Sequence, residues 1–161
     1  MTKFVSDSNY KGVIISRFNL QKVKKTLAVK SQALHEHIIS QFTYIGEECV
    51  RIARESGSYN DITGNLRSSI GYVILQDGKP VVNGEAKQYS GTKGNGEAGP
   101  AAAEALLTQL QAKFPWGIVL IVCAGMNYAA YVENVRHKDV LTTAELKAES
   151  LLKQLLNGIV Q

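Results

Sequence analysis

The sequence predicts an α+β domain in which a long N-terminal helix packs on a small, mostly antiparallel sheet, with further helices towards the C-terminus. Two observations predict this class. Residues 20–55 carry one continuous helical stripe of apolar side chains, and two short β-favoured runs joined by Asp-Gly follow them. Helices and strands are segregated along the chain, which is typical of α+β domains with antiparallel sheets.

The long helix is predicted over residues 20–55, where eight apolar side chains fall on one face at 100° per residue: Leu20, Val23, Leu27, Leu34, Ile38, Ile45, Cys49 and Ile52. Asn19 is expected to cap its start, and Gly57 to end it in a left-handed conformation. A straight helix of this length measures about 54 Å, against about 40 Å for a compact domain. We therefore expect a kink, at Gly46 or in the basic first turns, or packing of the exposed end on another subunit.

A hairpin is predicted after the helix. The runs SIGYVILQ (69–76) and PVVNG (80–84) flank DGK, and Asp-Gly supplies the positive φ angles of a tight hairpin turn. The next segment, residues 84–100, has five glycines and no aliphatic side chain larger than alanine. This composition predicts a mobile loop.

The C-terminal part is predicted to hold one strand and three helical segments. Pro100 is expected at the first position of a helix that Pro115 stops, and the apolar run at 116–125 to form a central strand buried on both faces. Residues 127–135 read as a helical turn or short helix. A final helix is expected from a capping box of Thr142 and Glu145 to Gly158.

Length and composition indicate a single folded domain over residues 1–161, with 45% hydrophobic and 20% charged residues. No apolar run is long enough to span a membrane, and the first ten residues lack the apolar core of a signal peptide. We therefore expect an intracellular protein with no membrane partner. Cys49 and Cys123 lie in apolar surroundings without metal-ligand spacing, so both are expected as reduced core thiols.

The net charge of +4 is concentrated near the N-terminus, because residues 1–55 hold nine Lys or Arg against five Asp or Glu. Five cations there have no acid between them: Arg17, Lys22, Lys24, Lys25 and Lys30. Such a basic patch suits nucleic acid or an acidic protein surface. A solvated helix face has the same composition.

No arrangement typical of catalysis is present in the sequence. The three histidines lack metal-ligand spacing, and the glycines of residues 91–99 match no phosphate-binding loop. Ser68 and Ser69 lack the context of a nucleophile, and Glu133 and Asp139 are poorly spaced for one helix face. We predict no catalytic residue, no metal site and no cofactor, and expect the protein not to be an enzyme.

Two segments resemble a known family. DITGNLRSSIGYVI (61–74) resembles the D-T-G-x-L-R-x-S-I element, and AGMNYAAYVENV (124–135) the Y-A-x-Y-V-E element, of the tail-completion or head-tail joining family of tailed bacteriophages and prophages. In that family both elements follow a long N-terminal helix, and the similarity in order covers roughly residues 20–157. Here Ile62 separates the Asp and Thr of the first element, and the ending after Glu133 differs.

The residues that match the two elements are Asp61, Thr63, Gly64, Leu66, Arg67, Ser69 and Ile70, then Tyr128, Ala129, Tyr131, Val132 and Glu133. Thr63 and Gly64 are expected to form a turn, and Leu66 and Ile70 to anchor the core. Arg67 is placed for a bidentate ion pair with a carboxylate, and Glu133 is the partner that we hypothesise.

The resemblance implies a structural protein that works as a homo-oligomeric ring between the capsid portal or its adaptor and the tail-tube proteins. It also implies assembly in the bacterial host cytoplasm, a final place in the virion neck or tail, and order in the 84–100 loop on docking. One alternative is a nucleic-acid-binding module that contacts DNA through the basic start of the helix. A small hydrolase would require a deep pocket with convergent polar groups.

Overall fold

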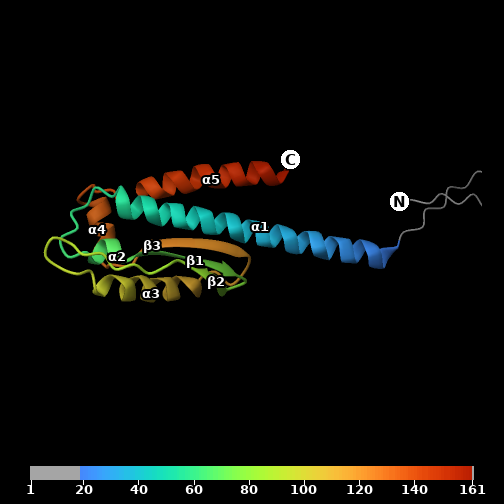
Figure 1. Ribbon diagram of the computed structural model, residues 1–161, viewed down its shortest axis with the longest axis horizontal. Coiled ribbons are helices and arrows are strands. Elements are labelled where there is room, and N and C mark those ends of the chain that lie inside the picture. Colours follow the sequence, from blue (N-terminus) through green and yellow to red (C-terminus); the bar gives the residue numbers. More distant parts are fainter. Residues whose placement is uncertain (1–18, 161) are drawn as a thin grey trace, which may run out of the picture. The chain divides into compact units, whose positions relative to one another are not determined.

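The computed structural model describes residues 19–160 and confirms the α+β class (Figure 1). The elements are α1 (Leu20–Glu55), α2 (Asn65–Ser68), β1 (Ile70–Gln76), β2 (Lys79–Asn83), α3 (Ala98–Gln111), β3 (Ile118–Ala124), α4 (Ala129–Asn134) and α5 (Thr142–Val160). The chain divides into two compact units between residues 37 and 38. The single domain over residues 1–161 stays a prediction.

Helix α1 begins and ends at the predicted residues, but Gly57 does not end it in a left-handed conformation. The Lys22 amide donates a 3.1 Å hydrogen bond to Oδ1 of Asn19, which caps the first turn. The helix ends at Glu55, and Gly57 is not among the described glycines with positive φ. No break occurs at Gly46 either: a Cβ there would lie 2.6 Å from the Tyr72 ring, so the missing side chain lets β1 approach α1.

The sheet has the strand order β2-β1-β3, with both neighbouring pairs antiparallel. The hairpin is confirmed, since β1 and β2 are joined by Asp77 and Gly78 with φ angles of 49° and 76°. The prediction of a central β3 was wrong: β1 is central and β3 lies at an edge. Helices cover both faces of this edge strand and bury Ile121 and Cys123, whereas its other five residues are only partly buried.

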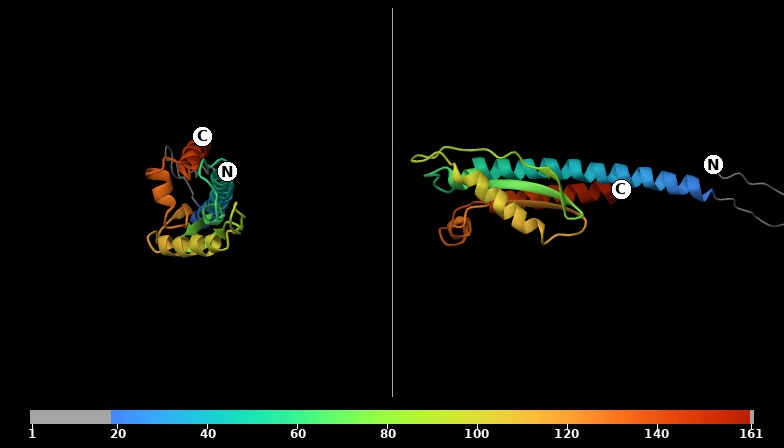
Figure 2. Two further views of the ribbon diagram at one scale, coloured as in Figure 1. Left: turned by 90° about the vertical axis from the view of Figure 1, so that its left-hand side faces the viewer. Right: turned by 90° about the horizontal axis from the view of Figure 1, so that it is seen from below.

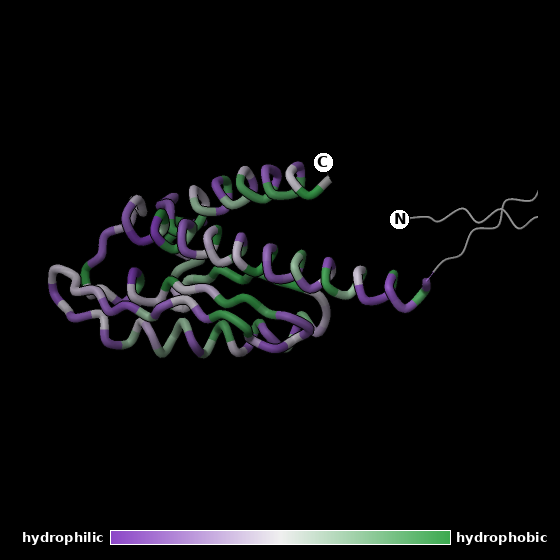
Figure 3. Tube along the Cα trace, turned by 45° about the vertical axis from the view of Figure 1, so that its right-hand side comes forward, coloured by the Kyte–Doolittle hydropathy of each residue, from purple (hydrophilic) through white to green (hydrophobic). Residues whose placement is uncertain are grey.

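Within residues 38–160 the elements form three layers. Helix α3 covers one face of the sheet, and α5 with the end of α1 covers the other (Figure 1, Figure 2). Hydrophobic residues follow the strands between these helices (Figure 3). The core between α1, α5 and the sheet contains Ile45, Cys49, Val50, Ala53, Ile70, Tyr72, Ile74 and Ala144.

Alternate residues of β1 serve the two faces, as the period of two in a strand requires. Ile70, Tyr72 and Ile74 pack towards α1, whereas Val73 and Leu75 form a second cluster with Ile121 on the α3 side. Both cysteines are buried free thiols, as the sequence predicted. Burial raises the pKa of the Cys123 thiol to about 11.

The predicted boundaries of two helices need correction. Helix α3 begins at Ala98, so Pro100 is its third residue, and α5 runs beyond Gly158 to Val160. The short helix expected within residues 127–135 is confirmed as α4. No helix of the described chain has the length and apolar character to cross a membrane.

Candidate interaction site

Three segments meet at one end of the sheet, and we call this region the motif end. They are residues 59–69 before β1, the Gly-rich segment 84–97 before α3, and residues 125–141 between β3 and α5. The backbone amide of Gly125 donates to the carbonyl oxygen of Ser69 at 2.9 Å, and Ser69 Oγ accepts from the Met126 amide at 3.3 Å. Ser69, which the resemblance places in the first element, therefore connects that element to the second.

The first element forms a tight turn into α2. Gly64 has φ +80°, and a Cβ there would lie 1.9 Å from the carbonyl oxygen of Tyr89, so only glycine fits. Thr63 Oγ1 accepts a long, 3.4 Å hydrogen bond from the Asn65 amide. Leu66 and Ile70 are buried, with 4% and 1% of their surface exposed, in agreement with the expected anchoring role.

The Gly-rich segment lies along this turn. Its backbone amides donate to the first element: Lys93 to the Ile62 carbonyl at 2.7 Å and Gly96 to the Thr63 carbonyl at 2.8 Å. The Tyr89 amide donates to Ser68 Oγ at 2.7 Å. These bonds oppose mobility between residues 89 and 96, and the mobility expected from composition stays a prediction.

The predicted ion pair between Arg67 and Glu133 was wrong. The Arg67 guanidinium lies over the ring of Tyr89, with 4.4 Å between Cζ and the ring centroid. Arg54 approaches the same ring at 5.4 Å and donates a 2.7 Å hydrogen bond to the Ile70 carbonyl. The sequence gave no indication of Arg54 and Tyr89, because a cation–π contact has no fixed spacing along the chain.

Glu133 instead binds the start of α5. Its Oε1 accepts hydrogen bonds from the Leu141 amide (3.1 Å), the Thr142 amide (2.8 Å) and Thr142 Oγ1 (2.6 Å). Asp139 Oδ1 accepts from the Thr143 amide at 3.1 Å. Two upstream carboxylates thus cap the helix, where their negative charge also complements the helix dipole, and they replace the capping box predicted for Thr142.

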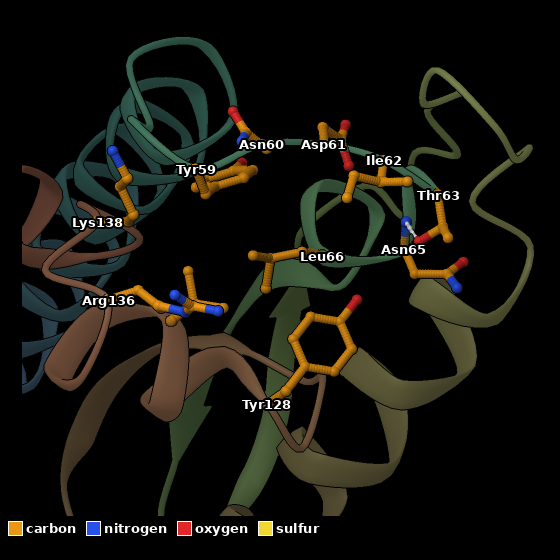
Figure 4. A pocket seen from close by; sticks show the side chains of 11 residues that line it. Tyr59, Asn60, Asp61, Ile62, Thr63, Asn65, Leu66, Tyr128, Arg136 and Lys138 are labelled. Carbon is orange, nitrogen blue, oxygen red and sulfur yellow. Dashed lines mark hydrogen bonds between the residues drawn. The ribbon is translucent and has the colours of Figure 1, made fainter.

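The two elements line one groove of about 800 Å³ (Figure 4). One side comes from the loop before α2 and from α2 itself, and the other from residues around α4. The lining comprises Tyr59, Asn60, Asp61, Ile62, Thr63, Asn65, Leu66, Tyr128, Val132, Arg136 and Lys138. Tyr131 lies on α4 with half of its surface exposed. The Cζ atom of Arg136 lies 6.0 Å from the centroid of the Tyr131 ring.

The charges in and beside this groove are mixed. Burial raises the pKa of the Asp61 carboxyl, whereas the nearby Arg67 guanidinium acts in the opposite direction. Burial, with Asp61 beside it, also raises the pKa of Tyr59 to about 12. The groove is therefore lined by two tyrosines, the partly buried Asp61 carboxyl and the cations Arg136 and Lys138. Among residues 19–160, no group of three His, Cys, Asp or Glu side chains is placed to hold a metal ion.

The predicted basic patch does not form a single charged face of α1. Lys22, Lys24, Lys25 and Lys30 are all exposed on α1, whereas Arg17 lies outside the described residues. At 100° per residue these lysines spread around the helix axis, and Lys24 and Lys30 flank the apolar stripe. Lys24 and Lys30 therefore border the apolar stripe, whereas Lys22 and Lys25 lie on the opposite face of the helix.

Comparison of the chain with protein-family models, with curated proteins and with solved structures found no match.

Proposed function

We propose that this protein is a structural component that joins heads to tails in a tailed bacteriophage or prophage. The observation that carries the proposal is the meeting of the two family-like elements: Asp61, Thr63 and Leu66 line the same groove as Tyr128 and Val132. These residues are more than fifty positions apart in the chain, yet they build one surface. A shared functional surface is a physical reason for both elements to occur together.

The side chains around the groove suit a protein partner. Tyr128 and Tyr131 are exposed by 37% and 51%, next to Arg136. Tyrosine and arginine are enriched at protein interfaces because they combine large contact area with polar groups. The proposed partners are the portal or its adaptor, the tail tube, and further copies of this chain in a ring.

The first half of α1 adds a second surface for assembly. Leu20 and Leu27 are 67% and 61% exposed, and Val23 and Leu34 on the same stripe are also exposed. Burial of apolar surface gives about 25 cal/mol per Å², so association is the favourable way to remove this stripe from water. Assembly is proposed to take place in the host cytoplasm, with the protein then held in the virion neck.

Electron microscopy of lysates tests the proposal. The reading frame is deleted from the phage or inducible prophage that carries it, and the wild-type chain is supplied from a plasmid in a parallel culture. We expect filled heads apart from complete tails in the deletion lysate, and joined particles after complementation. Normal joined particles without the protein would reject the proposal and would turn attention to DNA binding. That alternative requires a steep salt dependence that is lost in Lys22→Ala/Lys24→Ala/Lys25→Ala.

A further inference from the structure

The two edges of the sheet differ in their protection against further strands. β2 has five residues, includes Lys79 and Pro80, and pairs with β1 through a register shift between Ile74 and Leu75. Charge, proline and bulges are the usual means of blocking an edge. β3 has seven residues, IVLIVCA, and none of these features. Among residues 19–160 no strand pairs with the outer edge of β3, which can therefore accept another strand.

The hydrogen bonds of the sheet identify the groups on this edge. Gly125 bonds Ser69 through its amide, so in the antiparallel register every second residue back from Gly125 also faces β1. The intervening residues direct their N–H and C=O groups away from β1. These are Ile118, Leu120, Val122 and Ala124.

An apolar groove of about 470 Å³ runs beside the same edge. Ile118, Leu120 and Val122 form its floor on the α1 and α5 side of the sheet. Phe42 and Cys49 of α1, and Leu141, Ala144, Glu145, Ala148 and Leu152 of α5, complete the lining. A strand added to β3 would place every second side chain in this groove, as in other peptides bound by strand addition.

The sequence contains a segment of matching length and chemistry. Eight residues, KGVIISRF (11–18), precede the cap of α1 and lie outside the described residues. Val13, Ile14 and Ile15 are β-branched and suit a pleated, half-buried surface. Lys11 and Arg17 complement Glu145, the carboxylate that lines the α5 side of the groove.

We propose that residues 11–18 of a second copy of this chain add to the free edge of β3 as a fourth strand. The open backbone groups would gain partners, and Val13 and Ile15, which share one face of the strand with Lys11 and Arg17, would fill the apolar groove. Each copy both donates a segment and offers an edge, so the contact is heterologous and repeats from copy to copy. It closes into a ring where the rotation between copies permits. This inference concerns self-association alone and does not depend on the head-to-tail joining role.

Amide hydrogen exchange measured by NMR on the purified protein tests the proposal residue by residue. The full chain is compared, over a range of concentrations, with a chain that begins at Asn19 after an initiating Met. We expect the amides of Ile118, Leu120 and Val122 to exchange at least about tenfold more slowly in the full chain, and increasingly so with concentration. The amides of Val119 and Ile121 bond to β1 and report that β3 is folded in both proteins.

A matched pair of variants locates the effect. Ile14→Asp/Ile15→Asp should remove the outward protection and shift the sedimentation coefficient to that of a monomer. Phe4→Asp/Val5→Asp, with the same change of charge outside the segment, should leave both unchanged. Equal exchange of the outward amides in full and truncated chains would overturn the proposal, whether all are open or all are protected by some other strand. Protection that persists in a dilute monomer would overturn the role of a second copy.

Discussion

Both ends of the sheet hold glycines with positive φ, but the contacts around these glycines differ. At the motif end, Gly64 lies against the backbone of a third segment, and buried Arg54 bonds a strand carbonyl. At the opposite end, which we call the turn end, Asp77 and Gly78 close the hairpin, and a Cβ on Gly117 would meet nothing within 4 Å. The motif end is fixed by close backbone contacts among three segments, whereas the turn end combines local turn geometry with two hydrogen bonds between Asp77 and Gly117.

The largest expected difference between the ends is at their glycines, both with positive φ. Gly64→Ala should lower the free energy of unfolding by more than about 3 kcal/mol, because the methyl group collides with the Tyr89 carbonyl. Gly117→Ala should cost about 1 kcal/mol, from backbone strain alone. Urea unfolding followed by circular dichroism measures both. Equal losses would show that the motif end is no more tightly constrained than the turn end.

The arginines of α1 give the next comparison. Arg54→Met removes the donor to the buried Ile70 carbonyl and should cost about 2 kcal/mol. Arg51→Met, which breaks exposed pairs with Glu48 and Glu55 on the same helix, should leave stability nearly unchanged. Both substitutions keep a long aliphatic side chain. A larger loss from Arg51→Met in urea unfolding would contradict the structural role given to Arg54.

The sequence predicted features with local causes and missed those set by distant partners. The apolar stripe of α1, its Asn19 cap and the Asp77-Gly78 turn each depend on neighbouring residues, and all three are present. The edge position of β3 depends on how many strands the chain supplies, which an apolar run does not encode.

The prediction of the candidate site likewise succeeded for residue positions and failed for contacts with distant partners. The resemblance selected Asp61, Leu66 and Tyr128, which do line one groove. It paired Arg67 with Glu133 on charge alone, although the first lies over Tyr89 and the second caps α5. The partner of a charged side chain depends on which groups the folded chain places near it. Sequence order alone therefore does not identify that partner.

Substitution of Glu133 tests whether this residue caps α5 and does not pair with Arg67. Glu133→Ala removes the acceptor of three donors and should cost about 1 to 2 kcal/mol, whereas Glu104→Ala on the exposed face of α3 is the neutral control. Combined with Arg67→Ala, the two losses should add to within about 0.5 kcal/mol. A coupling well above that value would restore an Arg67–Glu133 interaction.

The smallest effect is the pH dependence at Asp61. Its raised pKa means that the folded protein binds this proton more tightly than the unfolded chain, so ionisation of Asp61 lowers stability as pH rises through the folded pKa. Asp61→Asn should therefore gain up to about 0.5 kcal/mol over wild type near pH 7, and less near pH 4. Urea unfolding at both pH values measures this difference. A gain that is larger at pH 4 would contradict the assigned direction.

The most direct test of the functional account counts joined particles in the deletion lysate after complementation with paired surface variants. Tyr128→Ala/Tyr131→Ala removes exposed aromatic rings at the motif end, and Phe114→Ala/Trp116→Ala removes exposed rings at the turn end. With both proteins folded and equally expressed, the account predicts that the first pair leaves heads and tails separate and the second restores joining. Full joining by the first pair would contradict the proposed role of the groove.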